Sequence, residues 1–163
     1  MFKKILKNEK GLTLIELLAV VVILGIIAAI AVPAIGGIID NTKKDAHVAN
    51  AQQMISAAKV AIAGKADLAP VKAKDKTYLN LTYLINNGYI QSDLKDPDDK
   101  EKSYITGDTE VAGSTAPTGT DSYVIVIKSD DGKTIGYSVV LTGNVRHISE
   151  TAEGALDRGK VTE

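Results

Sequence analysis

A single carboxylate stands at the start of a long uncharged stretch near the beginning of this 163-residue chain. Glu16 lies five residues after Gly11, and no charged side chain occurs between Leu17 and Ile39. The stretch 17–39 is long enough to cross a bilayer, since about 20 apolar residues are sufficient. A charge inside a membrane segment costs a few kcal/mol and by default marks a functional residue. Glu16 is therefore the first candidate for a site, because some partner must compensate its charge.

No other residues have the spacing of a catalytic centre. The two histidines, His47 and His147, lie 100 positions apart, without ligand spacing or triad partners. Glycine-rich phosphate-binding motifs are missing as well. Since the chain contains no cysteine, thiol catalysis, cysteine metal sites and disulfides are excluded. We therefore expect a protein that is not an enzyme, needs no cofactor and is held together by packing.

An oxygen-rich run is the candidate for a metal site. Its members are Asp93, Asp96, Asp98, Asp99 and Glu101. Calcium requires six to eight oxygen ligands, and this run lacks the regular spacing and the glycine of a calcium loop. The sequence therefore favours an acidic surface turn, with Asp93, Asp96 and Asp98 as weak candidates for calcium ligands.

The first eleven residues are basic and suggest a targeting segment. They contain Lys3, Lys4, Lys7 and Lys10 but only one acidic residue, Glu9. Such a charge bias orients an apolar segment with its N-terminus in the cytoplasm. A secretory signal peptide has a similar head, but here the apolar stretch is longer and no export cleavage site follows it. A plain signal anchor fits better and leaves Glu16 unexplained.

The segment Lys10-Gly11-Leu12-Thr13-Leu14-Ile15-Glu16 resembles the N-terminal motif of the type IV pilin family, which includes the pseudopilins. Pro33 also stands where family members commonly carry a helix-kinking proline. The resemblance covers about the first forty residues, and Leu12 replaces the usual phenylalanine. Many pilins have a C-terminal disulfide that this chain cannot form, which hints at a pilin of the Gram-positive type.

The resemblance implies two sites in this motif. A membrane prepilin peptidase would cut between Gly11 and Leu12 and then methylate the new amine of Leu12. Glycine suits such a cut because it brings no side chain into the cleft. In a stack of parallel helices, Glu16 would pair with the Leu12 ammonium of a neighbour, and breaking a buried pair is costly. The alternative is a carboxylate that reaches the cytoplasmic interface without a partner.

The function implied is that of a structural subunit, the major pilin of a type IV pilus. The subunit would be anchored in the cell membrane by a single pass and would then join an extracellular homo-oligomeric filament, built by an assembly platform and its ATPase. A pseudopilin of a competence or type II secretion system is the alternative, and a signal-anchored binding module is a third hypothesis. Adhesion, motility and DNA uptake stay open, because Lys72, Lys74 and Lys76 are a weak electrostatic footprint for nucleic acid.

These sites must be positioned by a long helix. We expect a leader at 1–11, a transmembrane and assembly helix at 12–39, an amphipathic continuation at 40–64 and a globular head at 65–163. The continuation is predicted from apolar residues at alternating spacings of three and four. They are Val48, Ala51, Ile55, Ala58 and Ile62, flanked by Met54 and Ala61.

Gly25 and Pro33 are candidate positions for a bend or for local loss of helix. Proline removes one backbone donor and clashes with the preceding turn, and glycine adds backbone freedom. Family filaments lose helix between the corresponding positions, so the resemblance implies melting of 25–33 in the filament. The alternative is a mild kink in a continuous helix, and both can hold at different stages.

The head is predicted to be a small antiparallel meander, which makes the fold class α+β. Strands are expected at 123–127, 135–141 and 145–148, with Asp130-Asp131-Gly132 as the first hairpin. A short helix is expected at 77–87, ending at Gly88. The remaining predictions are a flexible exposed loop at 107–120 and a tail from Glu150 that is loose or adds an edge strand.

Overall fold

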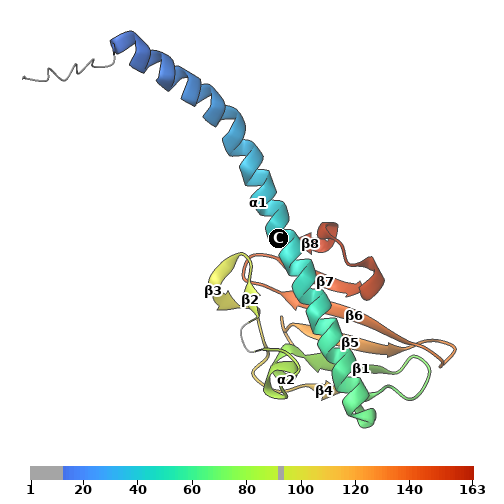
Figure 1. Ribbon diagram of the computed structural model, residues 1–163. Coiled ribbons are helices and arrows are strands. Elements are labelled where there is room, and N and C mark those ends of the chain that lie inside the picture. The colour runs from blue at the N-terminus through green and yellow to red at the C-terminus, as the bar shows by residue number, and fades with distance from the viewer. Residues whose placement is uncertain (1–12, 92–93) are drawn as a thin grey trace, which may run out of the picture. The chain divides into compact units, whose positions relative to one another are not determined.

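The computed structural model describes residues 13–91 and 94–163, and its ribbon is shown in Figure 1. Two compact units divide at Asp40, with the second unit covering Asn41–Glu163. The helices are α1 (Leu14–Gly64) and α2 (Leu81–Asn86), with short 3-10 turns η1 (Ala66–Leu68), η2 (Glu153–Ala155) and η3 (Arg158–Lys160). The strands are β1 (Lys76–Asn80), β2 (Lys95–Asp96), β3 (Asp99–Ser103), β4 (Ala112–Gly113), β5 (Tyr123–Lys128), β6 (Ile135–Thr142), β7 (His147–Ala152) and β8 (Val161–Thr162).

Helix α1 is continuous over 51 residues and ends at Gly64, as predicted. Gly25 and Pro33 both lie inside it, so the single chain has the continuous helix that was one of the two alternatives. From Asn41 onward the predicted apolar stripe faces the core. Its buried members are Ala51, Met54, Ile55, Ala58, Ala61 and Ile62, with Val48 packed at the margin.

The core of the second unit lies between this part of α1 and a six-stranded sheet (Figure 1). The strand order is β4-β1-β5-β6-β7-β8, and every neighbouring pair is antiparallel. The predicted meander forms the centre of the sheet, and Gly132 takes a positive φ of 67° in the first hairpin. Val124, Ile125 and Val126 are all buried, which fits a strand covered on both faces. The α+β fold is therefore confirmed.

Two further segments join the edges of the sheet: the tail, for which an edge strand was one of the two alternatives, and part of the segment 107–120, which was expected to be a loop. The chain after Glu150 adds the edge strand β8, which pairs with β7 at Ile148↔Val161. Within the expected flexible loop at 107–120, β4 pairs with β1 at Tyr78↔Gly113.

The predicted helix at 77–87 is wrong in its first part. Thr77 to Asn80 belong to β1, which pairs with β5 along its whole length. Helix α2 begins only at Leu81, and its N-cap is Asn80, whose side-chain oxygen accepts from the Tyr83 N–H at 3.0 Å. The predicted end is confirmed, since Gly88 follows with a positive φ of 75°. Pairing with β5 therefore outweighed the local helical pattern of the first four residues.

Candidate functional site

Glu16 lies in the first turn of α1 and is held by Thr13. The Thr13 backbone N–H and hydroxyl both donate to Glu16 Oε2, at 2.8 and 2.7 Å. In return, the Glu16 N–H donates to Thr13 Oγ1 at 3.3 Å. Thr13 is the residue before the helix and Glu16 is its third residue, so the pair forms a reciprocal capping box. The two side chains therefore satisfy backbone donors that the helix start would otherwise leave unpaired.

The predicted processing point lies outside the described residues. Gly11 and Leu12 both precede Thr13, so cleavage between them and methylation of Leu12 stay predictions. The predicted pairing of Glu16 with a neighbour's Leu12 stays a prediction too. Asp93, one of the three weak metal candidates, also falls outside the described residues.

The part of α1 that follows Glu16 presents apolar side chains to its surroundings on every side. Up to Ile39, its large apolar residues are between 49% exposed at Val20 and 71% exposed at Ile30. The helix is long and apolar enough to cross a membrane, and its most apolar window has no buried residue. Soluble monomers rarely expose apolar patches above a few hundred Å², so a membrane or protein partners must cover this surface.

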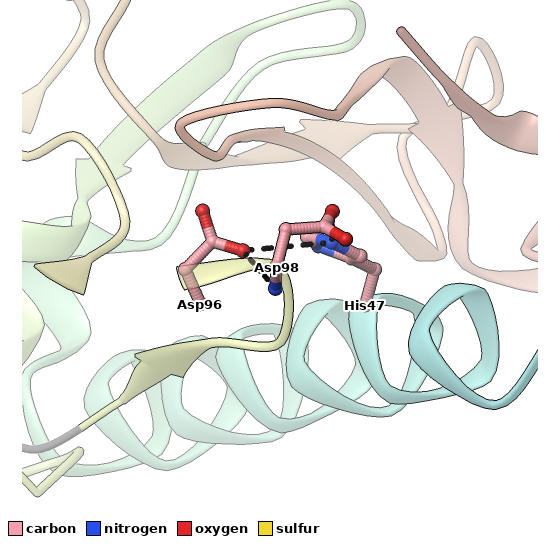
Figure 2. A group of neighbouring side chains, drawn as sticks. All are labelled: His47, Asp96 and Asp98. Carbon is pink, nitrogen blue, oxygen red and sulfur yellow. Dashed lines mark hydrogen bonds and ion pairs between the residues drawn. The ribbon is translucent and has the colours of Figure 1, made fainter. Parts of the chain in front are cut away.

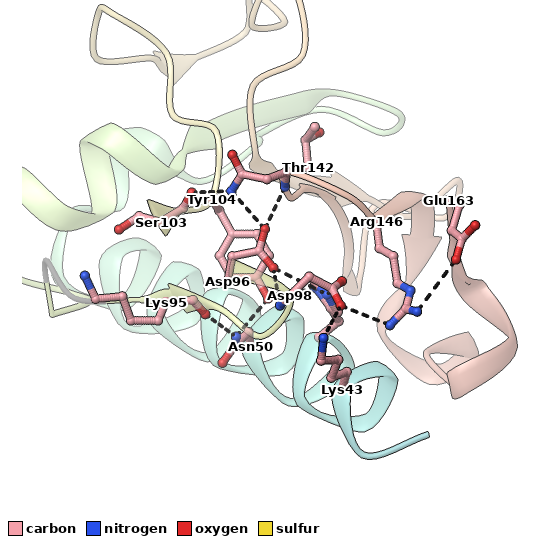
Figure 3. Close-up of polar contacts among 12 residues, drawn as sticks. Lys43, Asn50, Lys95, Asp96, Asp98, Ser103, Tyr104, Thr142, Arg146 and Glu163 are labelled. Carbon is pink, nitrogen blue, oxygen red and sulfur yellow. Dashed lines mark hydrogen bonds and ion pairs between the residues drawn. The ribbon is translucent and has the colours of Figure 1, made fainter. Parts of the chain in front are cut away.

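The second unit contains a buried polar cluster between α1, the β2–β3 hairpin and the turn before β7. Figure 2 shows its centre, where the His47 side chain on α1 points toward two carboxylates of the hairpin. His47 Nε2 lies 2.9 Å from Asp98 Oδ2 and 3.7 Å from Asp96 Oδ1. His47 is 1% exposed and Asp96 is fully buried. The whole cluster comprises Lys43, His47, Asn50, Asp96, Asp98, Tyr104, Asn144 and Arg146 (Figure 3).

Tyr104 determines which nitrogen of His47 carries the proton. Asn50 Nδ2 donates to the Tyr104 hydroxyl oxygen at 2.8 Å, and that hydroxyl lies 2.9 Å from His47 Nδ1. The Tyr104 O–H is therefore assigned as the donor to Nδ1, and His47 Nε2–H as the donor to Asp98. With this assignment every polar atom along the chain of contacts from Asn50 to Asp98 has a partner.

Asp98 is the most heavily contacted carboxylate of the cluster. Its Oδ1 lies 3.3 Å from Lys43 Nζ and 3.2 Å from Arg146 Nη1, while its Oδ2 accepts from His47. Burial raises the pKa of Asp98, but the hydrogen bonds from His47 and Lys43 and the charge of Arg146 lower it, to a net value below the ordinary one. Burial raises the pKa of Tyr104, which keeps its hydroxyl protonated. Asp98 is therefore ionised in the folded protein, and the hydrogen-bond donors around it stabilise its negative charge.

Asp96 and Asp98 were predicted to lie in an acidic surface turn, and this is wrong because both side chains are covered. Together with His47 they bring three ligand-type atoms within 4.8 Å of one another, a group that could hold a metal ion. Asp96 already accepts from the Asn144 N–H at 2.6 Å and from the Asp98 N–H at 2.9 Å. Lys43 and Arg146 balance the two negative charges, which is what a cation would otherwise do. The arrangement is therefore that of a structural cluster.

The sequence analysis did not predict two parts of these sites. The cap role of Thr13 has a sequence signal, since Thr followed three residues later by Glu before an apolar run is typical of a helix start. The buried cluster has no comparable signal, because His47, Asp98 and Arg146 are far apart in the sequence. The second histidine, His147, lies on β7 and shares a 3.1 Å hydrogen bond with Thr162 of β8.

Comparison with known proteins agrees with the N-terminal site. Residues 6–32 match the family model of the prokaryotic N-terminal methylation motif. Two relatives from Pseudomonas aeruginosa, both named fimbrial protein, are 30% identical over 136 residues, which is 83% of this chain and 79% of each relative. No solved structure matches the chain significantly.

A methylation motif at the start of a long apolar helix, joined to an α+β unit, defines a class of membrane-anchored filament subunits. The chain belongs to the type IV pilin family. The resemblance seen in the sequence is therefore confirmed. Pilins are structural subunits that assemble into filaments and are processed by a prepilin peptidase.

Proposed function

We propose that this chain is the major subunit of a type IV pilus. It is cut between Gly11 and Leu12, methylated on the Leu12 amine and polymerised into an extracellular filament through the apolar part of α1. The observation that carries this proposal is the exposure of the large apolar side chains from Leu14 to Ile39, with one carboxylate at the beginning of this surface.

This apolar surface needs two successive environments. Before assembly, the bilayer covers it, and the four lysines of the leader keep the N-terminus in the cytoplasm. In the filament, the same side chains pack against the helices of neighbouring subunits, which excludes water and lipid from them. A platform and an ATPase in the membrane are the partners that move the subunit from the first environment to the second.

Glu16 sets the register of that packing. Its Oε2 is bound by Thr13, and we assign Oε1 to the Leu12 ammonium of the neighbouring subunit. The Thr13 N–H belongs to the Leu12–Thr13 peptide bond, so cleavage before Leu12 leaves the capping box intact. The carboxylate is thus already oriented when the neighbour arrives. A subunit out of register would leave a charge uncompensated in a low-dielectric surrounding, which is strongly unfavourable.

The processing step is tested by mass spectrometry of the chain purified from cell membranes and from sheared filaments. A chain that begins with methylated Leu12 supports the proposal. An intact Met1, or an N-terminus after Ala34, would contradict it. Electron microscopy then separates the two kinds of pilin: long filaments with this chain as main component identify a major pilin, and a minor or filament-free chain points to a pseudopilin.

The assembly step is tested by Glu16→Leu, with Glu150→Leu as matched control. Glu150 is an exposed residue of β7, so its replacement makes the same chemical change away from α1. We expect the Glu16 variant to stay membrane-inserted and to lose surface filaments, while the control forms them normally. Normal filaments from the Glu16 variant would refute the register role of this carboxylate.

A further inference from the structure

The segment 94–104 is attached to the second unit in a different way from the other strands. It contains β2 and β3, which form a two-stranded sheet of their own outside the six-stranded sheet. Its buried apolar residues are Leu94 and Tyr104, which lie at its two ends, while Lys95, Glu101, Lys102 and Ser103 are exposed. Segments with few buried apolar contacts open with a lower free energy than core strands.

Polar contacts attach the segment to two neighbouring elements (Figure 3). On the side of α1, Asn50 donates to the Tyr104 hydroxyl and to the Lys95 carbonyl oxygen. On the side of the β6–β7 turn, the Asn144 N–H donates to Asp96. Directly after the segment, the Ile105 N–H donates at 2.9 Å to the carbonyl oxygen of Thr142, the last residue of β6.

Asp98 joins all three elements at one point. Its side chain is 4% exposed and contacts Lys43 and His47 of α1 as well as Arg146 of the turn. Arg146 is itself only 9% exposed in its side chain, and its guanidinium also lies 3.7 Å from the exposed Glu163 carboxylate, so removing the charge of Asp98 takes away the nearer and more buried of these two carboxylates. Breaking a buried pair in this way is destabilising, because the remaining charge loses its nearest buried counter-charge.

We propose that the segment 94–104 is a strap that opens from α1 as a unit of its own while the six-stranded sheet stays folded, and that Asp98 is the residue that keeps it shut. Opening separates β2 and β3 from α1 and exposes His47 and Asn50, which the closed strap covers or engages. The strap is thus a conformational device that changes which side chains of α1 the second unit presents to solvent or to a partner.

The test is hydrogen–deuterium exchange followed by mass spectrometry on the full-length chain in detergent micelles. In the wild type, peptides covering 95–105 should exchange through openings at least tenfold more frequent than those of β5 and β6. Asp98→Asn should accelerate exchange of the strap about a hundredfold and change β5 and β6 by less than about threefold. Asp130→Asn is the matched control, because Asp130 is an exposed residue outside the strap and its carboxylate lies 3.7 Å from the exposed Lys74.

Two results would overturn the proposal. One is equal opening of the strap and of β5 and β6 in the wild type, and the other is equal acceleration of all three by Asp98→Asn. If Asp98→Asn does not fold, Tyr104→Phe replaces it, since it removes only the hydroxyl between Asn50 and His47. Its strap should exchange roughly tenfold faster with β5 and β6 unchanged, and an unaltered strap would overturn the proposal as well.

Discussion

The replacement Asn80→Ala should destabilise the second unit more than a single lost hydrogen bond would. Asn80 is fully buried where β1 meets α2. Its Oδ1 accepts from the N–H groups of Tyr83 and Val111, both at 3.0 Å, and its Nδ2 donates to the Thr109 carbonyl oxygen at 2.8 Å. Losing the helix cap costs about 1 kcal/mol. Losing the hydrogen bonds to the Val111 N–H and to the Thr109 oxygen, both partly buried, adds about 1 kcal/mol each.

The expected loss is thus about 3 kcal/mol, which lowers the midpoint of thermal unfolding by roughly 10–15 °C for a unit of this size. The assay is near-ultraviolet circular dichroism of the full-length chain in detergent, since the tyrosines report tertiary packing. The matched control is Asn86→Ala, because Asn86 is an exposed residue of the helix that Asn80 caps and its side chain donates to the exposed Glu110. A decrease below about 3 °C, or an equal decrease in the control, would refute this account of Asn80.

Three further predictions concern the second unit. The folded-state pKa of Asp98 lies below its ordinary 3.8, so the stability from its charge is complete above that value and is lost as the pH falls through the folded pKa. Strap protection, corrected for intrinsic exchange, should therefore hold from pH 7 to about 4 and decrease only below it, whereas a decrease near pH 6 would contradict this assignment. Met54→Ala should cost about 3 kcal/mol in thermal unfolding, because Met54 is fully buried between α1 and the sheet, and a cost below about 1 kcal/mol would contradict its core role. Asp45→Asn should leave the thermal midpoint unchanged within about 2 °C, although Asp45 forms an ion pair with Arg158, because both side chains are about half exposed. A larger decrease would show that this pair contributes more than exposed pairs usually do.

Regular patterns in the sequence predicted the parts of the fold that depend on local periodicity. The spacing of apolar residues in 48–62 predicted which side of α1 is buried, and alternation in 135–141 predicted β6. Gly88 and Gly132 predicted a helix end and a hairpin, because both adopt the positive φ that glycine tolerates best. In each case the residues that carry the information are neighbours along the chain.

Prediction failed where a distant segment decided the outcome. Thr77 to Asn80 are compatible with a helix in isolation, but they extend along β5, more than forty residues later in the chain. For the tail after Glu150 the sequence left open a loose end or an edge strand, and the pairing of Ile148 of β7 with Val161 decides for the edge strand. Asp96 and Asp98 looked like surface residues because nothing in their own neighbourhood shows the cations that neutralise them.

The sequence by itself determined the family and the position of the N-terminal motif. The N-terminal motif consists of local features: a basic leader, a glycine, a lone glutamate and a long apolar stretch. Their chemistry can be inferred without knowledge of the fold. Only the tertiary structure decided that His47, Asp98 and Arg146 share one buried cluster. The reason is physical: a buried charge is stable only beside its counter-charge, and folding alone brings α1, the β2–β3 hairpin and the turn before β7 to the same point.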